Sequence, residues 1–226
     1  MIWERLIRLE KDMLEVLERD MTEYNEPGME RFNKEGWTNR TFKNKYVRRA
    51  HVDVVDARDT KRLWMAHICL FPNTTNGGPI YGFDVIAGEN KITGCFHDFS
   101  PLLQKDHPLT EYFVEETKWF KPSKRRELPE WATKIFSRGM IAAANIREFK
   151  ELNQICELAV SNLYSYLDKI RDWDNTAKPE AVIEAQNYYC EHQAQNPHTQ
   201  RVMLSLGLPE EDVKIFNENN LWPKIN

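Results

Sequence analysis

Residues 46–101 constrain the fold more than any other stretch, because short runs of alternating apolar residues end there at turn signals. Such runs cover residues 63–71, 80–87 and 91–96. The segment 72–79, with its Pro, Asn and Gly residues, must be a loop between two of them. Alternation with a period of two, bounded by turns, is typical of an antiparallel sheet. The sequence therefore predicts such a sheet at the centre of the fold.

Helical patterns flank this predicted sheet. Residues 2–21 place an apolar stripe at helical spacing, with charged residues between its members. The stripe consists of Ile2, Leu6, Leu9, Met13, Leu17 and Met21. Residues 146–170 form a second amphipathic helix, and Pro179 opens a third that reaches Gln193. A short helix that ends at Gly207 and a final helix complete the prediction.

The predicted sheet needs helices on both faces, because both sides of segment 63–71 are largely apolar. We therefore expect an α/β fold, a three-layer α/β/α sandwich with a central antiparallel sheet. A hydrophobic content of 41% supplies a substantial core, and no Gly/Ser-rich or Pro-rich linker divides the 226 residues. Residues 1–226 are thus expected to form a single domain.

Three stretches have weaker patterns. Residues 25–44 look polar and irregular. Residues 97–131 look like loops around one short helix near 109–117, and residues 135–141 have the composition of a strand or of the edge of the core.

The composition excludes several classes of protein. The first residues are charged throughout, and no apolar run approaches the ~18 residues of a membrane span, so we expect a soluble, cytoplasmic protein. A net charge of −4 does not favour nucleic-acid binding. The four cysteines lack ligand spacing and are expected to be free and mostly buried. No dinucleotide fingerprint, P-loop or exposed apolar seam is present, so we expect no bound cofactor and a monomer.

Two ionisable residues lie in the predicted buried strands. Asp84 interrupts the apolar run 80–87, and His67 is centred in the run 63–71. A carboxylate cannot stay ionised in an apolar interior unless it is paired. Strands joined by one loop are neighbours, so His67 and Asp84 can face each other and share a proton, as a proton-delivering enzyme requires. The alternative is that the two side chains only satisfy each other structurally.

His51 and Asp53 lie on one face of an earlier strand. A polar edge strand would explain this spacing. Metal binding would need a third ligand that neither the spacing nor the cysteines supply, so no metal site is expected.

Six segments together resemble the ferredoxin-dependent bilin reductases. They are AHVDV, WMAHICLFP, PIYGFDVIAG, FHDFSP, RRELPEW and QNPHTQRV. Their order and spacing match that family from about residue 46 onward. The resemblance implies an α/β/α sandwich that binds an open-chain tetrapyrrole between the sheet and the C-terminal helices. It also implies that reduced ferredoxin supplies single electrons and that the protein supplies protons without a bound metal or flavin.

The resemblance also implies residue roles. Asp84 matches the family's central catalytic aspartate and His67 the histidine that is paired with it. His51 matches a pocket histidine near the lactam oxygens of the substrate. Arg126 matches an arginine that clamps a substrate propionate, for which its forked guanidinium is suited.

The sequence differs from the family pattern at two places. Asp53 stands where the phycocyanobilin-forming branch has a glutamate that protonates a vinyl group, and the shorter side chain weakens proton delivery. The loop that often reads NDKT is here Asn196-Pro197-His198-Thr199, in which Asn196 and His198 are expected to bind substrate. Proline cannot replace the second catalytic aspartate as a proton donor.

These features resemble a phage-associated branch close to the phycocyanobilin-forming enzymes. Resemblance to that branch implies four-electron reduction of biliverdin IXα to phycoerythrobilin, through 15,16-dihydrobiliverdin, in a photosynthetic or phage-infected cell. The alternatives are reduction to phycocyanobilin and, in another class, a non-catalytic tetrapyrrole carrier. Basic residues are expected to dock the acidic ferredoxin. The candidates are Arg48, Arg49, Lys121, Lys124 and Arg125.

Overall fold

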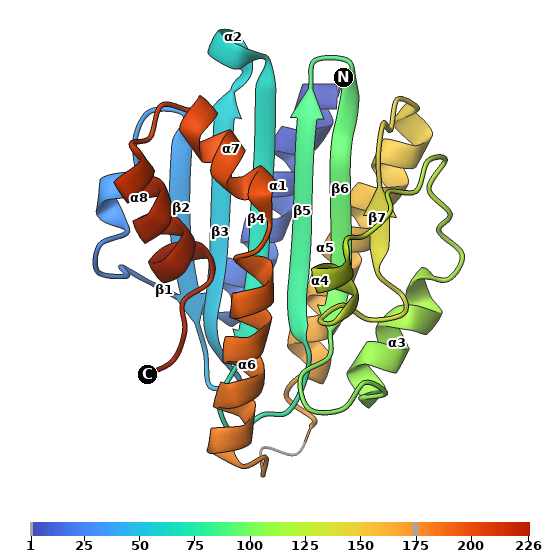
Figure 1. The fold of residues 1–226 in the computed structure, drawn as a ribbon. Helices are drawn as coiled ribbons and strands as arrows, with labels where there is room; N and C mark the ends of the chain where they lie inside the picture. Colours follow the sequence, from blue (N-terminus) through green and yellow to red (C-terminus); the bar gives the residue numbers. More distant parts are fainter. Residues whose placement is uncertain (1, 174–175) are drawn as a thin grey trace.

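A seven-stranded sheet forms the centre of the computed structural model, which describes residues 2–173 and 176–226 (Figure 1). The strands are β1 (Thr22–Tyr24), β2 (Trp37–Lys43), β3 (Val47–Ala57), β4 (Leu63–Pro72), β5 (Ile80–Gly88), β6 (Lys91–Ser100) and β7 (Ile141–Ala143). Their spatial order is their order along the chain, and each pairs antiparallel with the next. The predicted antiparallel sheet is confirmed.

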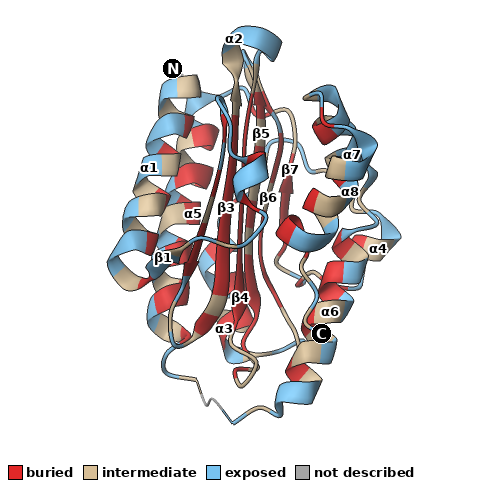
Figure 2. Cartoon of the chain, turned by 90° about the vertical axis from the view of Figure 1, so that its left-hand side faces the viewer, coloured by how far each residue is buried: buried red, intermediate tan, exposed pale blue. Residues whose placement is uncertain are grey.

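Helices cover both faces of the sheet and complete three layers (Figure 2). One face carries α1 (Ile2–Asp20), α3 (Pro108–Thr117) and α5 (Phe149–Lys169). The other carries α4 (Glu130–Thr133), α6 (Pro179–Gln193), α7 (Pro197–Ser205), α8 (Glu210–Ile215) and the π-helical turn η2 (Phe216–Leu221). Two short helices, η1 (Glu30–Phe32) and α2 (Arg58–Lys61), lie in connections. The predicted three-layer α/β/α sandwich is confirmed.

Strand β4 shows how alternation builds two cores. Trp64 and Ile68 pack into the cluster that includes α1 and α5, whereas Met65, Cys69 and Phe71 pack into the cluster beneath α6, α8 and η2. Burial of each large apolar side chain contributes about 1.5–3 kcal/mol. The four cysteines are free and buried, as predicted.

The irregular structure predicted for residues 25–44 is wrong at one end, because β2 occupies residues 37–43. The side chains of Trp37, Asn39 and Thr41 are buried on one face of this strand. Two of these three are polar, so the apolar alternation that marks a strand is missing. Asn39 and Thr41 lie opposite Asp53 and His51 of β3, which explains why polar residues occur there.

Of the two alternatives predicted for residues 135–141, the edge of the core is the better description, because Ile135, Met140 and Ile141 are buried and the strand begins only at residue 141. Strand β7 covers Ile141–Ala143, which pair with β6, and Ile146 adds an isolated bridge to Ile92 of β6. The preceding turn is held by Asp98 of β6, which accepts hydrogen bonds from the backbone amide and the hydroxyl of Ser137. In the described part of the chain, no helix has both the length and the apolarity needed to cross a bilayer.

Candidate active site

A row of polar side chains crosses the middle of the sheet. Asn39 of β2 lies opposite Asp53 of β3, which lies opposite His67 of β4. His67 lies opposite Asp84 of β5, which lies opposite Phe96 of β6. Residues directly opposite in antiparallel strands share one face of a sheet. The row therefore lies on one face, the one covered by α6, α7, α8 and η2 (Figure 1).

A cavity of about 800 Å³ separates the row from those helices. Asp53, His67 and Asp84 line it from the sheet. Its remaining polar lining includes Arg126, Gln193, Asn196 and His198, and much of its apolar wall is formed by Phe96, Trp131, Phe136, Met140, Val202, Met203, Leu221 and Trp222. A mostly apolar pocket of this volume with a few convergent polar groups is typical of a small-molecule site.

His67 and Asp84 form the predicted cross-strand pair, with 2.7 Å between Nδ1 and Oδ1. The His67 side chain is 6% exposed and the Asp84 side chain 39% exposed. Burial alone would lower the pKa of His67, but the Asp84 and Asp53 carboxylates together outweigh burial, so the pKa of His67 is raised. The pair can therefore hold a proton on the buried imidazole and present it at the carboxyl group that faces the cavity.

Asp53 lies beside this pair but is more deeply buried, at 1% exposure. The indole Nε1 of Trp37 donates a hydrogen bond to its Oδ1. Burial raises the pKa of Asp53 to about 6. Its Oδ2 and the Nε2 of His67 are buried and have no hydrogen-bond partner among the described residues.

His51, for which the family resemblance implies a place in the pocket, lies behind the cavity lining. Its side chain is fully buried, and its Nε2 lies 2.9 Å from Oδ1 of Asn39. Burial, followed by the charges of Arg49 and His67, holds the pKa of His51 well below its ordinary value. A neutral imidazole that donates from Nε2 orients the Asn39 amide. Direct contact of His51 with a ligand would require this layer to move.

Arg126, Asn196 and His198 come together at the cavity. The guanidinium Nη2 of Arg126 donates to Nε2 of His198 over 3.3 Å. The Asn196 side chain caps α7 by accepting from the backbone amide of His198 at 3.0 Å. Burial and the charges of Arg126 and Arg201 lower the pKa of His198. The Arg126 guanidinium in this lining suits a carboxylate.

Sequence reasoning missed two tryptophans of the site. The position of Trp37 beside Asp53 could have been inferred from the pairing of β2 with β3, but β2 was not predicted as a strand. Trp222 carries no local signal, because its position depends on the long-range packing of residues 216–222 over β4. No cluster of three or more His, Cys, Asp or Glu side chains suited to a metal ion occurs in residues 2–173 and 176–226.

Comparison with known proteins adds independent findings. Residues 7–207 match the family described as ferredoxin-dependent bilin reductase. The phycocyanobilin:ferredoxin oxidoreductase of Synechococcus sp. is 29% identical over 170 residues, which are 73% of this chain and 67% of that protein. A solved structure of a PcyX protein is 51% identical, with a TM-score of 0.74 over 98% of this chain and 99% of that chain.

A more distant structure has the same fold. The crystal structure of phytochromobilin synthase from tomato in complex with biliverdin has a TM-score of 0.76 over 94% of this chain and 82% of that chain. Its identity of 14% means that the likeness extends to the fold alone.

Proposed function

The chain belongs to the ferredoxin-dependent bilin reductases, and on that premise we propose that it reduces biliverdin IXα to phycoerythrobilin through 15,16-dihydrobiliverdin. The family membership makes the chain an oxidoreductase rather than a non-catalytic carrier. The overall reaction takes four electrons, one at a time from reduced ferredoxin, and four protons. A photosynthetic or phage-infected cell would supply both ferredoxin and biliverdin.

The pair formed by His67 and Asp84 supports a role in proton delivery. After each electron arrives, the reduced bilin is more basic and needs a proton donor within about 3 Å. Asp84 is the member of the pair that is exposed in the cavity, and His67 is the buried member that can reload it. We therefore assign Asp84 as the principal proton donor and His67 as the residue that sets its protonation state.

The placement of Asp53 is the observation that favours phycoerythrobilin over phycocyanobilin as the product. Its carboxyl group is 1% exposed, and one oxygen accepts from the Trp37 indole. A short side chain held in this way is poorly placed to protonate a vinyl group at the rim of the bilin. We therefore expect Asp53 to be dispensable for turnover and the D-ring vinyl group to remain intact in the product, as it does in phycoerythrobilin but not in phycocyanobilin.

Reduction to phycocyanobilin is the second candidate, because the similar protein of Synechococcus sp. is named phycocyanobilin:ferredoxin oxidoreductase. The test is anaerobic turnover of biliverdin with reduced ferredoxin, followed by chromatography of the product against standards. Phycoerythrobilin supports the first proposal. Phycocyanobilin would refute it and would mean that Asp53 still delivers a proton to the vinyl group.

Arg126 is proposed to bind a propionate of the bilin. Replacing Arg126 by Leu should weaken biliverdin binding by about 10- to 100-fold, because a charge-assisted hydrogen bond contributes about 1.5–3 kcal/mol. Titration of the absorption spectrum of bound biliverdin measures the effect. Arg147→Leu, at an exposed position outside the cavity lining, is the matched control. Equal affinities of the two variants would exclude this role.

The structure corrects the predicted ferredoxin surface. Arg49 is 2% exposed and bonded to Glu26, and Arg48 donates to Gln186 while it packs over the ring of Phe71. The Arg49 guanidinium is therefore buried and unavailable for docking, whereas Arg48 is only partly buried.

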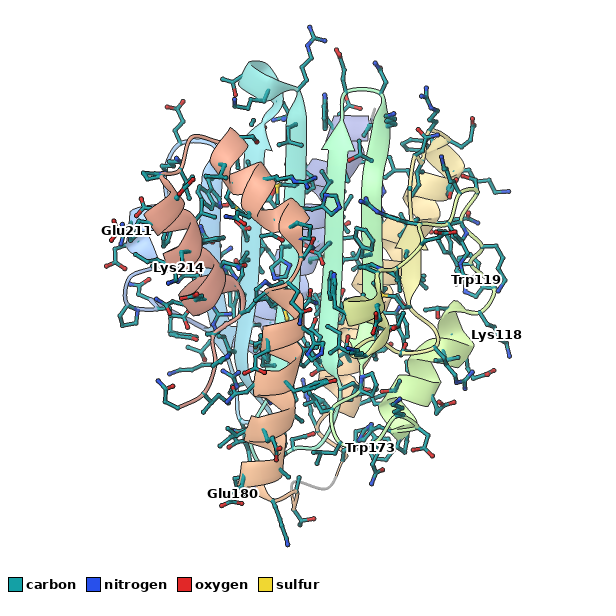
Figure 3. The ribbon with its side chains drawn as sticks, viewed as in Figure 1. Lys118, Trp119, Trp173, Glu180, Glu211 and Lys214 are labelled. Carbon is teal, nitrogen blue, oxygen red and sulfur yellow. The ribbon has the colours of Figure 1, made fainter. Side chains whose placement is uncertain are left out.

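The exposed Lys121, Lys124 and Arg125 remain as the proposed docking cluster. They directly precede Arg126 of the cavity lining, in a part of the surface that also carries Lys118 and Trp119 at the edge of the molecule (Figure 3).

Reversal of the docking cluster to Glu should slow ferredoxin-dependent turnover by at least about tenfold at low salt, with a smaller effect at high salt. Steady-state rates at two ionic strengths measure this effect. The control reverses three exposed lysines elsewhere, namely Lys61, Lys105 and Lys214. The docking cluster is excluded if both triple variants respond alike.

A further inference from the structure

Trp222 forms the part of the cavity wall that lies against the catalytic imidazole. The centroids of the Trp222 and His67 rings are 5.0 Å apart, and the ring planes meet at 82°. Trp222 is 5% exposed and lines the cavity. An edge-to-face contact of this kind brings the positive edge of one ring to the negative face of the other.

The segment that carries Trp222 is fixed from several sides. The guanidinium of Arg49 donates to the backbone carbonyl of Asn220 at 2.6 Å. The amide of Trp222 donates to the carbonyl of Asn217 at 3.0 Å. Asn187 of α6 donates to the carbonyl of Ile225 and accepts from its amide. The indole is therefore held against His67 by contacts on both sides of it along the chain.

We propose that Trp222 presents its indole face to the His67 imidazole, stabilises the cationic form of that ring, and so is a positioning residue for the proton-delivering pair. This inference rests on the role proposed above for His67. Nδ1 of His67 is bonded to Asp84, and its buried Nε2 has no hydrogen-bond partner among the described residues. An N–H that a second proton creates at Nε2 needs an acceptor. Oδ2 of Asp53, directly opposite His67 on β3, also has no partner among the described residues, and an aromatic face is a second kind of acceptor.

Other charged groups act on His67 as well. Asp84 of β5 and Asp53 of β3 favour its cation, whereas Arg49 of β3 opposes it. His51 of β3 lies with its ring 6.1 Å away. Arg126, beside β7 at the edge of the sheet, and His198 of α7 line the same cavity. The indole adds a favourable interaction without adding a charge, so it compensates for part of the burial cost of the cation.

The test is an NMR titration of His67 in the protein without biliverdin. In Trp222→Leu, the pKa of His67 should fall by about 0.4 to 1.5 pH units, the range expected for a cation–π contact. In Trp222→Phe, a weaker aromatic face remains and the pKa should fall by less. Leu221→Ala opens the same wall without removing a ring, and it should not lower the pKa of His67.

The outcomes separate this inference from the proposed function. An unchanged or higher pKa of His67 in folded Trp222→Leu and Trp222→Phe overturns the inference, whatever the turnover. A lower pKa supports it. If, in addition, the alkaline limb of the pH–rate profile moves to lower pH, His67 acts in turnover. If the pKa falls while the pH–rate profile does not move, Trp222 stabilises the cation and the role of His67 in the proposed function is refuted.

Discussion

Replacing Asp84 by Asn should lower the rate of biliverdin reduction by about 10²- to 10⁴-fold, the usual contribution of a general acid. Asparagine has nearly the same shape and can still bond to His67, but it cannot carry a proton to the substrate. Binding of biliverdin should therefore remain close to that of the unaltered protein. Single-turnover absorption spectroscopy with reduced ferredoxin measures the rate, and electron spin resonance would detect a radical that awaits its proton.

The control for this variant is Asp59→Asn, a change of the same chemistry at an exposed position in α2. It should leave both binding and turnover unaltered. Near-normal turnover by Asp84→Asn would show that the proton comes from another group. Loss of biliverdin binding together with turnover would show that Asp84 holds the substrate instead of protonating it.

Replacing Arg49 by Met should lower the free energy of unfolding by about 3 kcal/mol, because one partner of a mostly buried ion pair is lost. Arg49 bonds to both carboxylate oxygens of Glu26, with Nε–Oε1 at 2.8 Å and Nη2–Oε2 at 2.6 Å. It also donates to the Asn220 carbonyl, which would lose its partner. Equilibrium unfolding in urea, monitored by circular dichroism, gives the change.

Arg40→Met is the matched comparison for Arg49→Met. Arg40 bonds to both carboxylate oxygens of Glu23 with similar lengths, 2.7 Å and 2.6 Å. The Arg40 side chain is 29% exposed, against 2% for Arg49. Exposed pairs contribute about 1 kcal/mol or less. If the two variants lose the same stability, burial does not control the strength of these pairs.

The sequence predicted those parts of the site that depend on neighbouring strands. His67 and Asp84 lie in strands joined by one loop, and each interrupts an apolar run, so both their pairing and their face could be inferred. The register of β4 and β5 confirms that inference. Asn196 and His198 followed from the family resemblance alone, and the structure brings them to the cavity.

The remaining features depend on contacts that sequence periodicity does not record. Strand β2 buries Asn39 and Thr41, so its pattern resembles that of a loop. Arg49 looked like an exposed basic residue, because its partner Glu26 lies in a loop that the pattern does not relate to β3. The alternation of β3 places His51 on the face of the sheet that carries the cavity, but other side chains cover it, so it lies behind the lining.

The order of the strands has a consequence for how the chain folds. Each strand pairs with its neighbour along the chain, so the bond between His67 and Asp84 spans only 17 residues. The bond that anchors the cavity wall, between Arg49 and Asn220, spans 171. Local contacts form faster than distant ones, since closing a long loop costs more entropy. During refolding, the strands that carry His67 and Asp84 should therefore gain hydrogen-exchange protection before residues 216–222 do. Biliverdin should bind only after residues 216–222 have packed over the sheet.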